Sequence, residues 1–212
     1  MPVRSIKKQF TLGACGSDCG LCPRFYIRGA TRCPGCGAEG SPHCTIAVCA
    51  AERRGMETCA LCGEFPCAKL EKMQARWEHR NGGGPHPRRV HQNLQRVKEQ
   101  GLPSFLVEQQ SRIQWLKAML KSYDDGRSRS FFCACASLLS HKSLKASLLG
   151  IERRIREERV SREDIKGKVR LARNVIEELG RQEGLTFMTP HHPSRGKSRT
   201  PHTSKPSKIV LR

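Results

Sequence analysis

Residues 15–36, CGSDCGLCPRFYIRGATRCPGC, decide the fold of the N-terminal part of the chain, because they place five cysteines within twenty-two residues. Residues 11–67 hold ten of the twelve cysteines, with glycine and proline between them and few long apolar side chains. A segment of this composition buries too little apolar surface for a conventional core. We therefore expect cross-links between the cysteines to hold it together.

Three pairs of cysteines are separated by two residues, and this spacing favours a metal site. Two intervening residues form a tight turn that directs both thiolates to one ion, and two such pairs complete a tetrahedral four-sulfur site. The three pairs are Cys19/Cys22, Cys33/Cys36 and Cys59/Cys62. The full set of predicted metal ligands is Cys15, Cys19, Cys22, Cys33, Cys36, Cys44, Cys49, Cys59, Cys62 and Cys67.

The spacing does not identify the ion or the grouping of the ligands. Ten thiolates can form two four-cysteine zinc sites with two cysteines left over, or one four-cysteine site and a six-cysteine cluster of two zinc ions. They can also form two iron–sulfur clusters with two cysteines left over. We take zinc as the leading interpretation and [4Fe–4S] clusters as the alternative.

Two local patterns bear on the iron–sulfur alternative. Cys22-Pro23 is similar to the Cys-Pro that closes a ferredoxin motif, although the first gap here, Cys15 to Cys19, is one residue longer than in ferredoxins. The run C-x3-C-x2-C is also the cluster signature of radical S-adenosylmethionine enzymes. Those enzymes need a barrel of alternating strands and helices, and no such alternation follows here, so this reading is disfavoured.

The start of the chain, MPVRSIKKQFTLG, has no apolar run like that of a secretory signal, and no segment approaches the roughly 18 apolar residues that span a bilayer. We therefore expect a soluble, cytoplasmic protein without a membrane partner. Disulfides are rare in a reducing cytosol, where clustered C-x2-C pairs more often bind metal. This expectation disfavours a disulfide framework.

The chain has 39 basic and 19 acidic residues, and its net charge of +20 attracts polyanions. The excess is spread along the chain, and only residues 185–212 hold basic residues, six of them, without acidic ones. A nucleic-acid reader would concentrate the charge and interleave aromatic side chains, which make up only 5% here. We expect a protein partner, with weak non-specific nucleic-acid binding through the basic tail as a lesser alternative.

After Cys67 the sequence changes to helical patterns, which predict a mainly α fold with an irregular, metal-stapled N-terminal module. The predicted parts are a cysteine-rich module over residues 11–70, a helical region over 71–184 and a disordered basic tail over 185–212. Glycine and proline at 81–87 predict a flexible joint, and Ser161 is predicted to cap the last helix. Cys133 and Cys135, in the apolar segment FFCACASLL, are predicted core residues of a short helix.

The order CGSDCGLCPRFY, RCPGC, HCTIAVC and CALCGEFPCAKL resembles the cysteine-rich domain-of-unknown-function family DUF3795. The resemblance is specific across residues 13–70 and continues to about residue 184. It implies a metal-binding module joined to helices, in which the recurring cysteines match the ten positions given above. It implies no established activity.

The sequence contains no glycine-rich phosphate loop, no nucleophile elbow and no HExxH motif, so ordinary hydrolase or transferase chemistry is not indicated. Asp124 and Asp125 are best explained as turn-forming and capping residues. We therefore expect a binding or regulatory protein rather than an enzyme. The alternative of another class is an iron–sulfur electron-transfer protein.

Overall fold

The computed structural model describes residues 8–80 and 85–187, and these form helices and loops without any β-strand. The predicted mainly helical fold is confirmed. Because no strand occurs in these ranges, they contain no barrel of the kind that radical S-adenosylmethionine enzymes need. The α-helices are α1 (Thr45–Val48), α2 (Ala68–Arg80), α3 (Pro85–Gln100), α4 (Leu102–Tyr123), α5 (Arg129–Leu138), α6 (His141–Glu157) and α7 (Ile165–Gln182).

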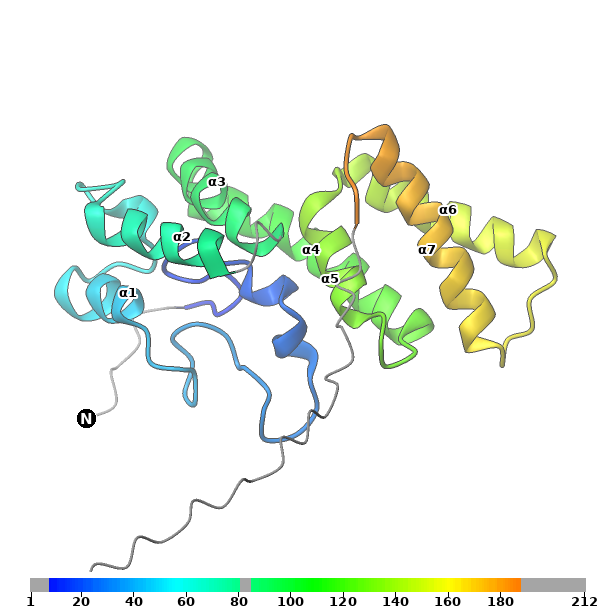
Figure 1. Cartoon of the computed structure of the whole chain (residues 1–212). Helices are drawn as coiled ribbons and strands as arrows, with labels where there is room; N and C mark the ends of the chain where they lie inside the picture. The colour runs from blue at the N-terminus through cyan, green and yellow to red at the C-terminus, as the bar shows by residue number, and fades with distance from the viewer. Residues whose placement is uncertain (1–7, 81–84, 188–212) are drawn as a thin grey trace, which may run out of the picture.

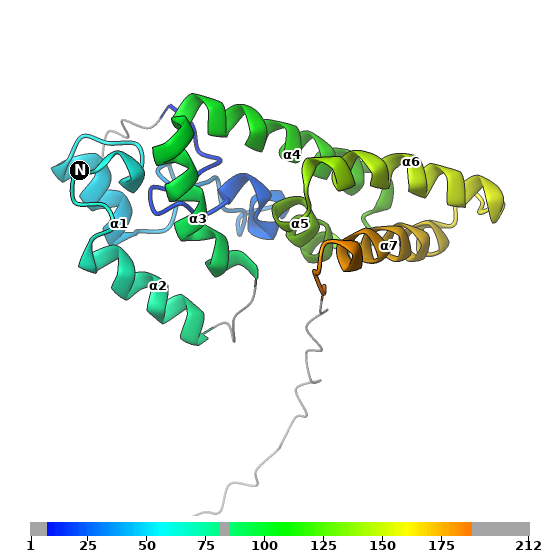
Figure 2. The same ribbon diagram turned by 90° about the horizontal axis from the view of Figure 1, so that it is seen from above.

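The cysteine-rich segment lies at one end of the molecule with α1, α2 and α3, and the α6–α7 pair lies at the other (Figure 1). The long helix α4 joins the two ends: it contacts α3 near its start and α5, α6 and α7 further along (Figure 2). Short helical turns punctuate the cysteine-rich segment, namely η1 (Cys19–Leu21), η2 (Pro23–Tyr26), η3 (Cys49–Arg53) and η4 (Cys59–Leu61). None of the helices in the described ranges is long and apolar enough to cross a membrane.

The helical end has an apolar core built by α4 to α7. Leu116, Phe132 and Ile176 are fully buried in it, and the cysteine-rich segment contributes Leu21 of η1 and the partly buried Tyr26 of η2. Cys133 and Cys135 are completely buried on α5, as predicted. Their small, weakly polar side chains fill space in this core.

The cysteine-rich segment has a core as well, which differs from the expectation that cross-links alone must hold it. Leu12, Ile46 and Leu70 are buried together with Leu94 of α3 and Phe105 of α4. The sequence of residues 11–67 lacks the apolar surface for a core, and α3 and α4 supply the missing part. The segment therefore packs against the helices and shares a core with them, and it does not form a separate domain.

Two helix starts differ from the predicted ones. The cap of α7 is Asp164, whose carboxylate accepts the backbone N–H of Gly167 at 2.9 Å, and not Ser161, which bonds instead to Glu163 in the preceding turn. The helix α3 begins at Pro85, inside the predicted joint of residues 81–87, because proline is tolerated in the first turn of a helix. The remaining residues of that joint, 81–84, lie outside the described ranges.

The ordered chain continues past the end of α7. Leu185 and Phe187 pack against the helical core, and the Phe187 ring meets Phe131 edge to face at 5.7 Å. The first residues of the predicted tail therefore belong to the folded part. The rest of the tail, 188–212, lies outside the described ranges, and so does the nucleic-acid binding predicted for it.

Candidate metal centre

Two of the predicted C-x2-C pairs form the same local structure. In each, the N–H of the second cysteine bonds to the carbonyl of the first at 3.1 Å, in the turns Cys19–Cys22 and Cys59–Cys62. The N–H of a following phenylalanine then bonds to the second cysteine, Phe25 to Cys22 at 3.0 Å and Phe65 to Cys62 at 3.1 Å. Both turns share the sequence pattern C-x-L-C-x-x-F, which the third pair, Cys33/Cys36, lacks. The C-x2-C spacing by itself does not distinguish the three pairs.

Four of the predicted ligands surround one cavity, with a volume of about 40 Å³, and they are Cys49, Cys59, Cys62 and Cys67. Cys49 begins η3 directly after α1, Cys59 and Cys62 bracket η4, and the carbonyl of Cys67 accepts the N–H of Leu70 at 2.9 Å where α2 begins. Three separate turns thus bring four sulfurs to one place. We call these four residues the cavity cysteines.

The environment of Cys59 favours its protonated thiol in the absence of an ion. Desolvation is the main cause that raises the pKa of Cys59 from 9.0 to about 12, and repulsion from Cys15, Cys67, Cys49 and Cys62 adds to it. A thiol with so high a pKa is a poor nucleophile at neutral pH. This chemistry suits a metal ligand that gives up its proton on binding better than a reactive cysteine.

Cys36 lies beside the backbone that leads into Cys15, where the backbone N–H of Ala14 donates to its sulfur at 3.5 Å. Cys36 and Cys44 are both partly buried against the core of the cysteine-rich segment. Burial raises the pKa of Cys15, and it raises the pKa of Cys19 to about 12. Repulsion from Cys36 and Cys44 contributes to raising the pKa of Cys15.

The last two predicted ligands lie in different surroundings. Cys22 is partly buried, and repulsion from it contributes to raising the pKa of Cys19 and of Cys133, a fully buried residue of α5. The backbone N–H of Cys33 bonds to the carbonyl of Arg24 in η2 at 3.0 Å. His43 is exposed beside Cys44, as predicted for a loop residue.

All twelve cysteines are free thiols. Within residues 8–80 and 85–187, no three cysteine, histidine, aspartate or glutamate side chains converge as ligands of one ion. The cavity cysteines are neighbours around a shared space, but they do not form a coordination sphere. Neutral thiols do not attract one another, so only an ion would draw their sulfurs to the Zn–S distance of about 2.3 Å.

The size of the cavity limits what it can hold. Sites for organic cofactors have volumes of roughly 300–1,000 Å³. The cavity of about 40 Å³ is therefore too small for an organic cofactor. Four cysteine thiolates are a donor set for a zinc ion and for an iron–sulfur cluster.

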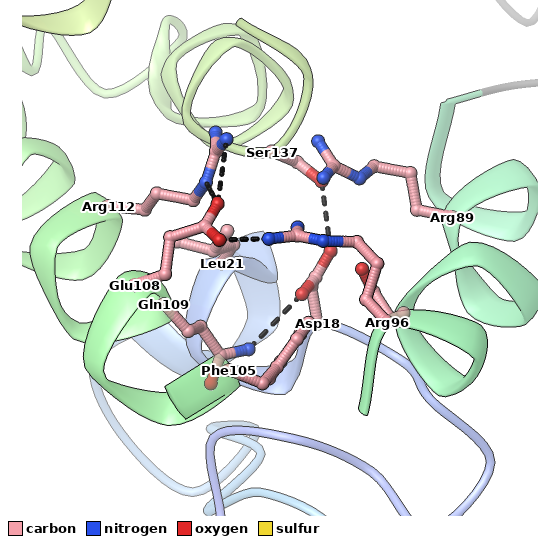
Figure 3. Close-up of a pocket in the computed structure, with 10 residues that line it drawn as sticks. Asp18, Leu21, Arg89, Arg96, Phe105, Glu108, Gln109, Arg112 and Ser137 are labelled. Atoms are coloured by element: carbon pink, nitrogen blue, oxygen red, sulfur yellow. Dashed lines mark hydrogen bonds and ion pairs between the residues drawn. The ribbon is translucent and has the colours of Figure 1, made fainter. Parts of the chain in front are cut away.

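A polar junction fastens the C-x2-C turn of Cys19 to the helices (Figure 3). The carboxylate of Asp18, which precedes Cys19, accepts hydrogen bonds from Gln109 of α4 at 3.1 Å and from Ser137 of α5 at 3.0 Å. Beside it, Glu108 forms ion pairs with Arg96 of α3 and with Arg112 of α4. A partly buried carboxylate with partners on two helices fixes the orientation of the turn.

The cavity at this junction has a volume of about 10 Å³, which is about the space that one water molecule needs. Arg89 Nε and Gln109 Oε1, both buried at its wall, have no hydrogen-bond partner in the part of the chain that the structure describes. A water molecule could satisfy both atoms, but no larger ligand fits. The junction is therefore a structural contact rather than a binding site.

The turn before α5 uses the carboxylates of Asp124 and Asp125. Asp124 accepts the N–H of Gly126 at 2.9 Å, and Asp125 accepts the N–H groups of Arg127 and Ser128 at 3.0 and 2.8 Å. Both carboxylates therefore form the turn, as predicted.

Comparison of the chain with protein-family models, with curated proteins and with solved structures finds no match. The resemblance to DUF3795 therefore stays a prediction. The geometry of the cysteines carries the functional argument that follows.

Proposed function

We propose that this protein binds zinc through cysteine thiolates, and that the bound metal stabilises its N-terminal half as part of a binding or regulatory protein of the DUF3795 type. The observation that carries the proposal is the cavity of about 40 Å³ between four free cysteines, Cys49, Cys59, Cys62 and Cys67. Four cysteines around one space are the ligand set of a closed structural zinc site.

The closed ligand set explains why a structural role is favoured over catalysis. Four thiolates fill all positions of a tetrahedral ion, so no position remains for water or substrate. Binding of structural zinc contributes on the order of 10 kcal/mol at neutral pH to folding. That contribution supports a segment whose apolar core is small and borrowed in part from α3 and α4.

The helical half is then left to present a surface to a partner protein. The net charge of +20 favours an acidic partner, because opposite charges steer association. Exposed apolar side chains on α4 and α6, Val107 and Leu149, are single and do not form a patch. The proposal therefore specifies the sign of the partner's charge and not its shape.

The test is the metal and sulfide content of the full chain, purified without oxygen from an iron-replete host. We expect zinc without acid-labile sulfide, and loss of about one ion per chain in Cys62→Ser. The control is Leu61→Ser, a change of the half-exposed neighbour in the same turn, which should keep its zinc. Iron with a matching amount of sulfide would make the protein a redox protein instead, and a wild-type chain without metal would refute both readings.

A further inference from the structure

We propose that Arg54 and Glu64 set the zinc affinity of the cavity in opposite directions: Arg54 compensates the negative charge of the zinc–thiolate centre, and Glu64 competes with that centre for Arg54. This inference rests on the proposed function and names residues that regulate its site without binding the ion. It predicts that removal of the two charges changes the affinity with opposite signs.

The charge of the centre is the physical reason. Four thiolates bring more negative charge than a divalent ion neutralises, so a closed four-cysteine zinc centre is a dianion. A neighbouring cation therefore stabilises the zinc-bound form, and a neighbouring anion destabilises it. Water and salt screen this interaction less between partly buried groups than at an open surface. Charged side chains that line the cavity are therefore expected to change its affinity.

Arg54 and Glu64 are the two charged side chains in the lining of the cavity. Their guanidinium and carboxylate form an ion pair, in which 42% of the Arg54 side chain and 61% of the Glu64 side chain are exposed. Three other lining residues, Thr58, Phe65 and Leu70, are buried. The ion pair therefore lies where the cavity faces solvent.

The backbone holds Arg54 close to one cavity cysteine. Cys49 begins η3, and Arg54 follows the last residue of that turn. The chain then bends back, so that the N–H of Met56 bonds to the carbonyl of Ala50 at 2.8 Å. Met56 and Ala50 also line the cavity. The loop that supplies Cys49 therefore places Arg54 beside the same space.

Glu64 is placed by the turn of another cavity cysteine. It follows Cys62 by two residues, and the N–H of Phe65 closes this turn on the carbonyl of Cys62 at 3.1 Å. The Phe65 side chain is buried and anchors the turn in the core of the cysteine-rich segment. The ion pair therefore connects the loop after Cys49 with the turn after Cys62.

A guanidinium at this position has two anions to choose between. It carries five N–H donors, so it can bond to a carboxylate and also donate to a metal-bound sulfur. Donors to metal-bound ligands tune the affinity of a site although they do not touch the ion. Glu64 holds Arg54 at the rim and adds a negative charge of its own. Arg54 therefore favours the zinc-bound form, and Glu64 opposes it.

The experiment is the apparent zinc affinity of the full chain and of Arg54→Gln and Glu64→Gln, measured by chelator competition at one pH. We expect Arg54→Gln to weaken zinc binding by about threefold and Glu64→Gln to strengthen it by about threefold. High salt should reduce both changes, because mobile ions screen exposed charges. Both variants should fold, since exposed ion pairs contribute little to stability.

An ion pair of the same type on α7 provides matched controls. The side chains of Arg181 and Glu178 are 69% and 54% exposed, and α7 lies at the opposite end of the molecule from the cysteine-rich segment (Figure 1). Arg181→Gln and Glu178→Gln change the net charge in the same way and should leave the zinc affinity unchanged. Changes as large as those at the cavity would mean that only the overall charge matters, and would overturn the proposal.

The signs of the two effects decide between the proposed role and a merely structural one. Equal weakening in Arg54→Gln and Glu64→Gln would mean that the ion pair only fastens the two turns, and it would overturn the proposal, as would an unchanged affinity in both. Zinc that is lost in Cys62→Ser but insensitive to Arg54→Gln would leave the proposed function intact and remove this inference. A wild-type chain without metal would remove both.

Discussion

At the scale of single residues, burial decides how the cysteines behave. Cys59 and Cys19 each have a pKa raised to about 12, mainly by desolvation, and Cys15 is buried with a pKa raised in the same direction. Reactive cysteines need the opposite, a pKa lowered by positive charge or a helix N-terminus. These thiols are therefore suited to hold a cation that displaces their protons.

The raised pKa values predict a steep pH dependence of zinc binding. Because the thiols of Cys59 and Cys19 hold their protons at neutral pH, each must release one when zinc binds, and lowering the pH favours the metal-free form. We expect the apparent affinity to fall by about tenfold for each proton released and each pH unit lowered, so by more than tenfold per unit for a multi-thiol site. Chelator competition at pH 6.5 and 7.5 measures the slope.

A zinc affinity that does not change with pH would contradict the prediction that protonated cysteines are the ligands. It would mean that the ligands are already thiolates or are not cysteines. The Leu61→Ser variant is the control. Since leucine cannot be a metal ligand, its replacement should leave the slope unchanged. A direct measurement of protons released into weakly buffered solution gives the same quantity by another route.

At the scale of elements, Gly16 shows how the cysteine-rich segment docks on α3. Gly16 and Gly29 have nearly the same φ, +91° and +90°, but a Cβ at Gly29 meets nothing within 4 Å, whereas one at Gly16 meets Val90 and Leu94. The buried side chain of Asn93 also donates to the Gly16 carbonyl at 2.9 Å. Both positions need glycine for conformation, but only Gly16 needs it for packing.

This pair makes a matched test. Gly29→Ala should cost about 1 kcal/mol of the free energy of unfolding through backbone strain alone. Gly16→Ala should cost about 3 kcal/mol, because the added methyl group must also displace the backbone of α3. Urea unfolding of the zinc-loaded protein measures both, and equal losses would show that the close contact with α3 does not contribute to stability.

The elements themselves were largely predictable from the sequence, but their contacts were not. Helical periodicity gives α2 to α7, and glycine and proline give most of their ends, because these signals act within one turn of the chain. The capping-box pattern predicts Ser161 as the cap of α7, whereas Asp164, three residues later, accepts the N–H of Gly167. Local rules cannot choose between two capping residues when packing sets the first turn.

For a related reason, the sequence does not predict which cysteines lie together. The C-x2-C spacing fixes each turn, and the ten candidate ligands follow from it, but the partner of each turn depends on contacts between distant residues. Cys36 lies beside Ala14, and Cys59 is bonded to the same residue, across 22 and 45 positions of sequence. The shared core of Leu70, Leu94 and Phe105 likewise depends on how α3 and α4 cover the segment.

At the scale of the whole molecule, the two apolar cores differ in how much they depend on side chains from the other half of the chain. The core of α4 to α7 includes Trp115, Phe132 and Ile151, and from the cysteine-rich segment it takes Leu21 and the partly buried Tyr26. The core of the cysteine-rich segment combines side chains of that segment with Leu94, Val97 and Phe105 of α3 and α4. Metal bound by the cysteines would therefore stabilise one core directly and the other only through α4 and the Asp18 junction.

This asymmetry predicts a stepwise loss of structure when metal is removed. After treatment with a chelator, we expect backbone amides in residues 11–70 to lose protection from hydrogen exchange, while those of α5, α6 and α7 keep it. The buried Trp115, whose indole N–H bonds to Ser147 at 3.0 Å, should keep its environment, because both residues belong to the helical core. Hydrogen exchange followed by mass spectrometry locates the loss, and the Leu61→Ser variant should respond to the chelator as wild type does. Loss of protection in all helices at once would mean that the junction through Asp18 makes the molecule a single cooperative unit, and no loss at all would mean that the apolar contacts of Leu12, Ile46 and Leu70 suffice without metal.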